Sequence, residues 1–276
     1  MIRPMEKGVP IRALSRGIAV LQALNQGVAL SMMQIARACC MPYPTACRIV
    51  QTFVHEGLVE REPTRKRYRP TALVQTLAHG FQEDAVLVRA ARPHIMELTA
   101  AFDWPITLST RVGPFMVIRD STHALTSLTF NYYYPGYRLP ILESAAGIVT
   151  LAFMPREQRQ GLLDSIKRLP QSRSPNVIGL LEQGSLVRET VANGYAKCHF
   201  NQFTRNPGKT SSLAVPIMTG DGDVAGAVTL AFFSSAIRMG QAERKFVAPM
   251  KNAAAKIGDA LASSHQDWPD DTEAAG

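Results

Sequence analysis

The chain has 276 residues, 46% of them hydrophobic and 19% charged, so it can form one large or two modest domains around a buried core. No apolar stretch approaches the ~20 residues of a membrane helix, and the N-terminus lacks the apolar core of a signal peptide. These features exclude an integral membrane protein and predict a cytoplasmic one. Four cysteines without a CxxC pair or a His partner at metal spacing predict free thiols and no metal site.

The net charge of +8 is concentrated near the N-terminus. Residues 1–80 hold 11 Lys and Arg against 4 Asp and Glu, whereas residues 81–276 hold 19 against 18. Such asymmetry favours a segment that binds a polyanion, with double-stranded DNA the obvious partner. A solvated basic face that only keeps the protein soluble is the alternative that charge by itself leaves open.

The first 40 residues predict two short helices. Apolar residues recur at helical spacing in ALSRGIAVLQALNQ, at Leu14, Ile18, Leu21 and Leu24, which indicates an amphipathic helix that ends at Gly27. Ser31 followed by Gln34 is a capping box and starts the next helix, MMQIARAC, with Ile35 and Ala36 facing inward.

A further helix is expected to begin at Pro42, because a proline in the first turn sacrifices no helical hydrogen bond. One face of this helix is apolar: Ala46, Ile49, Val50 and Phe53. Two helices joined by a tight turn, the second with polar side chains at its start, form a helix-turn-helix. Contacts to base edges are expected from three residues: Tyr43, Thr45 and Arg48.

After Gly57 the pattern changes to short strands, LVER and RYRP, around the loop EPTRK. This hairpin is interpreted as a wing, and its cations Arg65, Lys66 and Arg67 are expected to contact phosphates. The alternative for Arg48 is a salt bridge within the protein, to Glu56 or Glu60.

The segments SRGIAVLQAL, MPYPTACRIVQTF, EGLVER and YRPTALVQTLAHGF resemble, in this order, the N-terminal domain of IclR-type bacterial transcriptional regulators. Six residues fit the family's recognition-helix pattern: Met41, Pro42, Thr45, Arg48, Thr52 and Phe53. Tyr43 stands where a cation is common, and Pro44 where Ser or Thr is common. The resemblance therefore implies a DNA-binding helix of unusual specificity.

The resemblance extends over the rest of the chain. RLP followed by SAAGIVTLAF is similar to a motif of the family's second domain, except that Ile148 replaces a cation, and SSLAVPIMTGDGDVAGAVTLAFF is similar to its closing hairpin. It implies an α+β protein of four parts: a winged helix-turn-helix domain over 1–80, a linker or dimerisation helix over 81–101, a GAF-like α/β effector-binding domain over 102–265, and a disordered tail over 266–276.

The implied effector pocket can be partly read from its residues. Ser144 starts a helix whose free N–H groups can bind a carboxylate, and Ala145, Ala146 and Gly147 leave room for a ligand. Arg138 precedes that helix and is the expected partner of an anion. Other lining candidates are polar Ser212 and Thr229, apolar Leu108, Phe130 and Leu139, and the cationic loop with Arg205 and Lys209. The alternative is that Ser144 only caps a helix and Arg138 is a surface charge.

The stretch FNYYYPGYRLP, together with DWPITLSTR and RDSTHALTSLTF, is similar to IclR-type activators of aromatic acid catabolism, in particular of hydroxyphenylpropionate degradation. The resemblance implies a small aromatic carboxylate as effector. It also implies a homodimer or homotetramer, and contact with RNA polymerase if the protein is an activator. A short aliphatic acid is the alternative effector.

Two other functions are weighed against a regulator. An enzyme is disfavoured, because Cys198 and His199 are adjacent on an expected strand and point to opposite faces. The sequence also contains no nucleophile elbow, phosphate loop or dinucleotide fingerprint, so no cofactor is expected. The second half as a plain dimerisation module is the remaining alternative, and a ligand-induced shift in melting temperature would distinguish it from a sensor.

Overall fold

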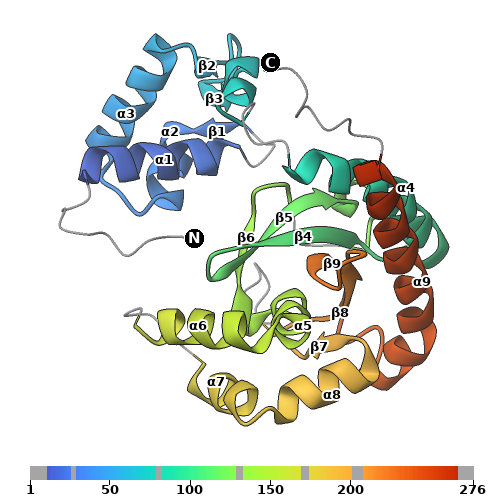
Figure 1. Cartoon of the computed structure of the whole chain (residues 1–276). Helices are drawn as coiled ribbons and strands as arrows, with labels where there is room; N and C mark the ends of the chain where they lie inside the picture. The colour runs from blue at the N-terminus through green and yellow to red at the C-terminus, as the bar shows by residue number, and fades with distance from the viewer. Residues whose placement is uncertain are drawn as a thin grey trace, which may run out of the picture. The chain divides into compact units, whose positions relative to one another are not determined.

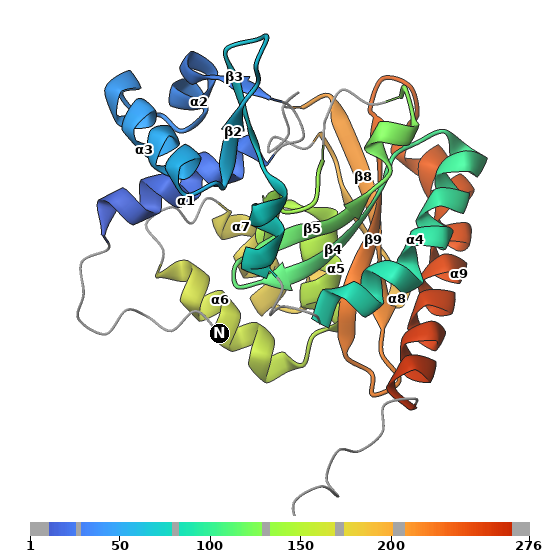
Figure 2. The same ribbon diagram turned by 90° about the horizontal axis from the view of Figure 1, so that it is seen from above.

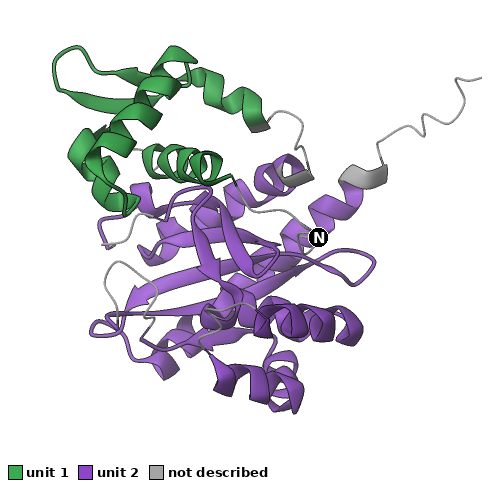
Figure 3. Cartoon of the chain, turned by 90° about the vertical axis from the view of Figure 1, so that its left-hand side faces the viewer, with its two compact units in different colours: residues 1–82 green, residues 83–276 purple. Residues whose placement is uncertain are grey.

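The computed structural model describes residues 11–25, 29–78, 83–128, 133–168, 174–200 and 208–266. Its chain divides into two compact units, residues 1–82 and 83–276 (Figure 3). Each unit has its own hydrophobic core and is described by itself. The expected linker helix over 81–101 corresponds to the first helix of the second unit, and the expected tail over 266–276 lies almost wholly outside the described residues.

The described part of the first unit contains three α-helices: α1 (Arg12–Leu24), α2 (Met32–Ala38) and α3 (Tyr43–His55). The capping box predicted for α2 is confirmed, since the Ser31 hydroxyl accepts from the Gln34 N–H and the Gln34 side chain accepts from the Ser31 N–H. These two bonds satisfy backbone groups that the start of a helix leaves free. The predicted helix-turn-helix is therefore present, with α3 as its second helix.

The prediction of which α1 residues face the core is partly wrong. Leu14 and Ile18 are 61% and 49% exposed, whereas Val20 and Leu24 are fully buried beside Gly17. A glycine faces inward because a Cβ at Gly17 would lie only 3.3 Å from the Phe53 ring of α3. The close approach of two helices has rotated α1 away from the face that leucine spacing indicates.

Three short antiparallel strands accompany these helices, in the order β1-β3-β2. Their bounds are β1 (Leu30–Ser31), β2 (Val59–Arg61) and β3 (Arg67–Pro70). The hairpin of β2 and β3 is the predicted wing. The described part of the segment after it forms a 3₁₀ helix, η1 (Ala72–Ala78).

The second unit is built on one antiparallel sheet of order β6-β5-β4-β9-β8-β7. Its first hairpin is formed by β4 (Ile106–Val112) and β5 (Phe115–Ser121), with the turn at Gly113. The predicted closing hairpin is confirmed, with its turn at residues 219–223. The bounds of the remaining strands are β6 (Arg138–Pro140), β7 (Ala196–Cys198), β8 (Thr210–Met218) and β9 (Val224–Phe233).

Two long helices, α4 (Glu83–Phe102) and α9 (Met239–Gln266), lie side by side on one face of this sheet (Figures 1 and 2). Pro93 lies inside α4 without ending it. Their apolar side chains and those of Ile106, Leu108 and Leu230 form one core cluster. None of the helices in the described parts of the chain combines the length and the hydropathy that a membrane span requires.

The other face of the sheet is covered by α5 (Ala145–Phe153), whose residues from Ala145 to Ala152 are all buried. A second core cluster forms here, with flanking helices α6 (Arg156–Lys167), α7 (Pro175–Glu182) and α8 (Ser185–Asn193). The left-handed Gly184 separates α7 from α8. Two short 3₁₀ helices, η2 (His123–Leu125) and η3 (Ile141–Glu143), precede α5.

A β-bulge in β5 changes which side chains face which layer. Ser109 pairs with Ile118, but the neighbouring Leu108 pairs with Asp120, so Arg119 is the extra residue. Asp120 therefore faces α4 like Leu108, and its carboxylate accepts from Arg92 at 2.5 Å. Ile118 stays on the α5 side of the sheet.

Candidate functional site

The first candidate site is the exposed side of α3. Pro42 caps the helix, Tyr43 begins it, and Pro44 occupies its second position, where a missing N–H costs no helical bond. Pro42, Tyr43, Pro44 and Arg48 are exposed and Thr45 is half-buried. Arg48 lies one turn after Pro44, opposite the buried Ala46 and Val50. The start of α3 is therefore free to enter a major groove.

The internal partner suggested for Arg48 is not found. Glu60 is bonded instead to Arg69, at 2.6 Å across the hairpin of β2 and β3. Within the described ranges no carboxylate lies within ion-pair distance of Arg48. Its guanidinium is thus available to a ligand such as a guanine edge.

Cys47 is a residue of this surface that sequence reasoning missed. A hydrogen bond with the Cys47 side chain, one helical turn along, raises the pKa of the exposed Tyr43. The spacing of four residues was the available signal, because side chains at i and i+4 of a helix are neighbours. Cys47 is therefore a neighbour of the Tyr43 phenol on the surface of α3.

The cations of the wing are placed differently from one another. Arg65 and Lys66 are exposed in the loop between β2 and β3, and in the described chain neither forms an ion pair. Arg67 lies in β3, is half-buried, and donates to the carbonyl of Ala29 at 3.4 Å. Arg65 and Lys66 are thus the freer of the three cations to meet phosphates.

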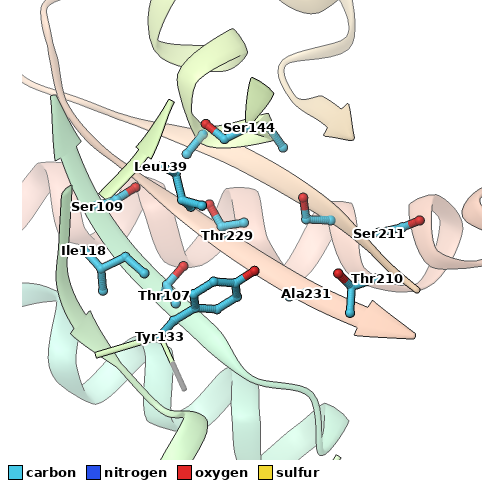
Figure 4. A pocket seen from close by; sticks show the side chains of 13 residues that line it. Thr107, Ser109, Ile118, Tyr133, Leu139, Ser144, Thr210, Ser211, Thr229 and Ala231 are labelled. Atoms are coloured by element: carbon cyan, nitrogen blue, oxygen red, sulfur yellow. The ribbon is translucent and has the colours of Figure 1, made fainter. Parts of the chain in front are cut away.

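The second candidate site is a cavity on the α5 face of the second unit's sheet, here called the hydroxyl pocket (Figure 4). Its lining comes from five strands, from α5 and from residues beside them: Thr107, Ser109, Ile118, Tyr133, Leu139, Ser144, Ala145, Ala146, Thr210, Ser211, Ser212, Thr229 and Ala231. Six of the residues predicted for the effector pocket are among them: Leu139, Ser144, Ala145, Ala146, Ser212 and Thr229. The described lining contains no charged side chain and seven aliphatic hydroxyls.

Three of these hydroxyls, on Ser109, Thr210 and Thr229, are buried and have no hydrogen-bond partner among the residues that the structure describes. Buried polar groups are almost always bonded, and one left unbonded costs about 1–3 kcal/mol. The free space is about 20 Å³, room for about one water molecule. The pocket thus presents hydrogen-bonding groups that its own chain does not satisfy.

The helix start beside this pocket is held by close backbone contact. The Ser144 hydroxyl accepts from the Gly147 N–H at 3.0 Å, as expected for a cap. A Cβ at Gly147 would lie 1.9 Å from the carbonyl oxygen of Ile141. Only glycine permits this approach, which seats the first turn of α5 on η3 and points it at the cavity. The N–H groups of Ala145 and Ala146 have no acceptor within the helix.

Arg138 does not line the hydroxyl pocket, contrary to expectation. Its side chain is exposed, and its guanidinium carbon lies 5.9 Å from the centroid of the Phe115 ring. Successive strand residues point to opposite faces, so Leu139 reaches the cavity and Arg138 turns away from it. The same alternation buries Leu108 in the core on the α4 side. Phe130 and Arg205 lie outside the described residues, and Lys209 is exposed.

An aromatic cluster borders the pocket. The buried Tyr133 ring extends among the lining side chains in Figure 4 and packs edge-on against His123, with ring centroids 4.8 Å apart, and against Tyr137. Burial lowers the pKa of His123 to about 3 and raises the pKa of Tyr133. Both side chains are therefore neutral at physiological pH. The His123 Nδ1 is 2.8 Å from the Ser121 hydroxyl.

The one Cys–His neighbour pair offers no reactive thiol. Burial raises the pKa of Cys198 to about 11, so the thiolate is a negligible species near neutral pH. In the described chain all four cysteines are free, and no group of three or more His, Cys, Asp or Glu side chains is arranged to hold a metal ion.

The chain matches two family profiles: the IclR helix-turn-helix domain over residues 13–63, and the bacterial transcriptional regulator IclR C-terminal domain over residues 81–259. It is 24% identical to KdgR of Dickeya chrysanthemi over 262 residues, 94% of this chain and 82% of that regulator. It is also 24% identical to TsaQ1/TsaQ2 of Comamonas testosteroni, over 57% of each protein.

Two solved structures show the same fold at low identity. IclR of Thermotoga maritima superposes with a TM-score of 0.64 at 18% identity, covering 92% of this chain and all of that one. An IclR homologue of Microbacterium hydrocarbonoxydans, complexed with 4-hydroxybenzoate, gives 0.64 at 22% identity, covering 91% and 99%. Because the C-terminal profile covers more than half of the residues, the chain belongs to the IclR family of DNA-binding transcriptional regulators.

Proposed function

We propose that the protein controls an operon for the catabolism of an aromatic acid, and that a small aromatic carboxylate in the hydroxyl pocket changes its affinity for operator DNA. The observation that carries the proposal is the set of three buried hydroxyls, on Ser109, Thr210 and Thr229, for which the described part of the chain provides no hydrogen-bond partner. A ligand oxygen that bonds to them removes an energetic cost already present in the unliganded fold.

The carboxylate is proposed to bind through neutral donors and not through Arg138. Candidate donors are these hydroxyls, Ser212, and the free N–H groups at the start of α5, where the helix dipole favours an anion. Leu139, Ile118 and Tyr133 offer apolar surface to an aromatic ring. The 4-hydroxybenzoate complex of the Microbacterium homologue supports this ligand class.

A short aliphatic acid is the second candidate effector. It is favoured by the free space of about 20 Å³, which an aromatic ring can enter only if the lining moves. Tyr133 is the largest side chain of the described lining, so its displacement would enlarge the pocket.

On DNA, α3 is proposed to lie in the major groove, with Tyr43, Thr45 and Arg48 at base edges and with Pro42 and Pro44 shaping its start. Arg65 and Lys66 would contact flanking phosphates, and Arg67 would assist from β3. One such domain reads few base pairs, so at least a dimer on a two-fold operator is proposed.

The test is binding of the full-length protein to the DNA upstream of its own gene and its neighbours, followed by fluorescence anisotropy. Benzoates, cinnamates, phenylpropionates and short aliphatic acids are then added. The proposal expects at least one aromatic acid to shift the operator affinity by about five-fold or more, a typical coupling. An effect from aliphatic acids alone would favour the second candidate. No binding or response to any acid would refute both.

A further inference from the structure

A second cavity lies on the same face of the sheet as the hydroxyl pocket, one turn further along α5. Its volume is about 230 Å³. Among its lining residues are Arg111 at the end of β4, Thr150 and Met154 of α5, Gln158 of α6, and Asp223 and Gly226 around the start of β9. It is far larger than the free space of the hydroxyl pocket, and the effector proposed above does not use it.

The cavity exists because the sheet divides at this end. β4 pairs with β9 only as far as Ser109 and Ala227. Beyond that point β4 stays with β5 up to Val112, and β9 stays with β8 up to Val224. A Cβ at Gly226 would lie 2.9 Å from the carbonyl oxygen of Ser109, so a glycine is required where the strands part. Beyond Ser109 and Ala227, the facing edges of β4 and β9 are not paired with each other.

Opposite charges stand at this division. Arg111 and Asp223 are both exposed and line the same cavity, yet they form no ion pair with each other or with any other described residue. The Gln158 amide adds a neutral donor and acceptor, and Met154 adds apolar surface. An anion alone would meet the repulsion of Asp223, and a cation alone that of Arg111.

We propose that this cavity binds a small zwitterion of the α-amino-acid type. Its carboxylate would pair with the guanidinium of Arg111, whose planar fork matches two carboxylate oxygens, and its ammonium group with Asp223. The volume is below the about 300–1,000 Å³ of sites for drug-sized ligands, which fits a short amino acid. This site is separate from the hydroxyl pocket, and the proposal does not rest on the aromatic effector.

The two cavities share structural elements, so their occupants affect each other. Ala146 lines the hydroxyl pocket and Thr150 lines the second cavity, and the Thr150 hydroxyl donates to the Ala146 carbonyl at 2.8 Å. On β4, Ser109 lines the first and Arg111 the second. A zwitterion that shifts α5 or β4 would thus alter the hydroxyl pocket, and the coupling would be reciprocal.

The experiment is calorimetry and thermal melting of the full-length protein with glycine, alanine, serine, glutamate and lysine as probes, against acetate and methylamine as single-charge controls. At least one amino acid should bind at millimolar concentration or below, and the single-charge compounds should not. Arg111→Ala and Asp223→Asn should each weaken that binding by about ten-fold or more, and Arg111→Lys by less.

Two matched variants locate the site. Arg156→Ala removes an exposed cation at the start of α6 that does not line the cavity, and Thr229→Val alters the hydroxyl pocket; neither should weaken amino-acid binding. Melting without ligand shows whether each variant is folded. The inference is wrong if no amino acid binds, if Arg111→Lys and Asp223→Asn bind like the wild type, or if Thr229→Val abolishes binding.

Discussion

The exposed side of α3 with its wing and the hydroxyl pocket contain opposite kinds of polar group. The first presents cations in water, Arg48, Arg65 and Lys66 among them, whose charges are fully solvated and act over about a Debye length. The second presents neutral hydroxyls, with those of Ser109, Thr210 and Thr229 buried and unbonded. Charge in water costs the fold little, whereas an unbonded buried hydroxyl destabilises it until a ligand arrives. The first surface should therefore respond to salt and the second to ligand chemistry.

The largest loss of stability should come from Gly147→Ala, which destabilises only the second unit. The added Cβ would meet the Ile141 carbonyl at 1.9 Å, so α5 must move, and we expect a loss of more than about 3 kcal/mol. Calorimetric melting should show the transition of the second unit lowered and that of the first unchanged. Gly161→Ala in α6, where a Cβ meets nothing within 4 Å, is the control and should be neutral or slightly stabilising.

Arg48→Ala should lower operator affinity by about 1–3 kcal/mol and relax the preference at one base pair. Anisotropy on the operator and on singly substituted operators measures both. Because the residue is exposed and unpaired, the melting temperature should not change. Equal losses on operator and on unrelated DNA would show that Arg48 contacts a phosphate instead.

The pH dependence of stability should also differ between the two units. Burial lowers the pKa of His123 from 6.5 to about 3, so folding favours the neutral ring. The stability that depends on this neutral ring is complete above pH 6.5 and is lost as the pH falls from 6.5 towards 3. At pH 5 the second unit should be less stable by about 2 kcal/mol. Urea titrations of His123→Gln should show a flatter profile.

Neutralising Arg65 and Lys66 together should weaken binding to all DNA sequences alike. If each cation neutralises one phosphate, the double variant should reduce the slope of log affinity against log salt by about 2. The same double change at Arg244 and Lys256, exposed cations of α9, should leave the slope as it is. A wild-type slope in the wing variant would contradict its role on the backbone.

The smallest expected effect distinguishes the two regions best, because one substitution should raise stability and lower effector affinity. Thr229→Val replaces an unbonded buried hydroxyl by a methyl group, so stability should rise by about 1 kcal/mol while effector affinity falls. Ser144→Ala, which removes a bonded cap, should instead lower stability by about 1 kcal/mol. Denaturant titration and calorimetry test both variants. A less stable Thr229→Val would mean that the hydroxyl has a partner in solution.

The helix-turn-helix and its wing could be predicted well from the sequence because their signals are local. The capping box at Ser31, the prolines at the start of α3 and the cations of the wing act within one turn or one hairpin. Leu14 and Ile18 show the limit: their spacing indicated a buried face, but contact between Gly17 and Phe53 turned α1 the other way.

The hydroxyl pocket required the tertiary structure. Ser212, Thr229 and Ser144 could be chosen from the sequence, but Ser109 and Thr210 join them only because β4, β8 and β9 lie side by side in the sheet. Arg138 was misplaced by one residue, because which residue of a strand faces a cavity depends on its register, here Met116 opposite Leu139.

By itself the sequence determined the helix-turn-helix and the wing, since periodicity, caps and turns are properties of neighbouring residues, and its motifs indicated the family by their resemblance. Only the tertiary structure decided that the bulge at Arg119 turns Asp120 toward Arg92, that Gly147 must be a glycine, and that the sheet divides beyond Ser109. These features depend on distances between segments far apart along the chain, which no local pattern of residues contains.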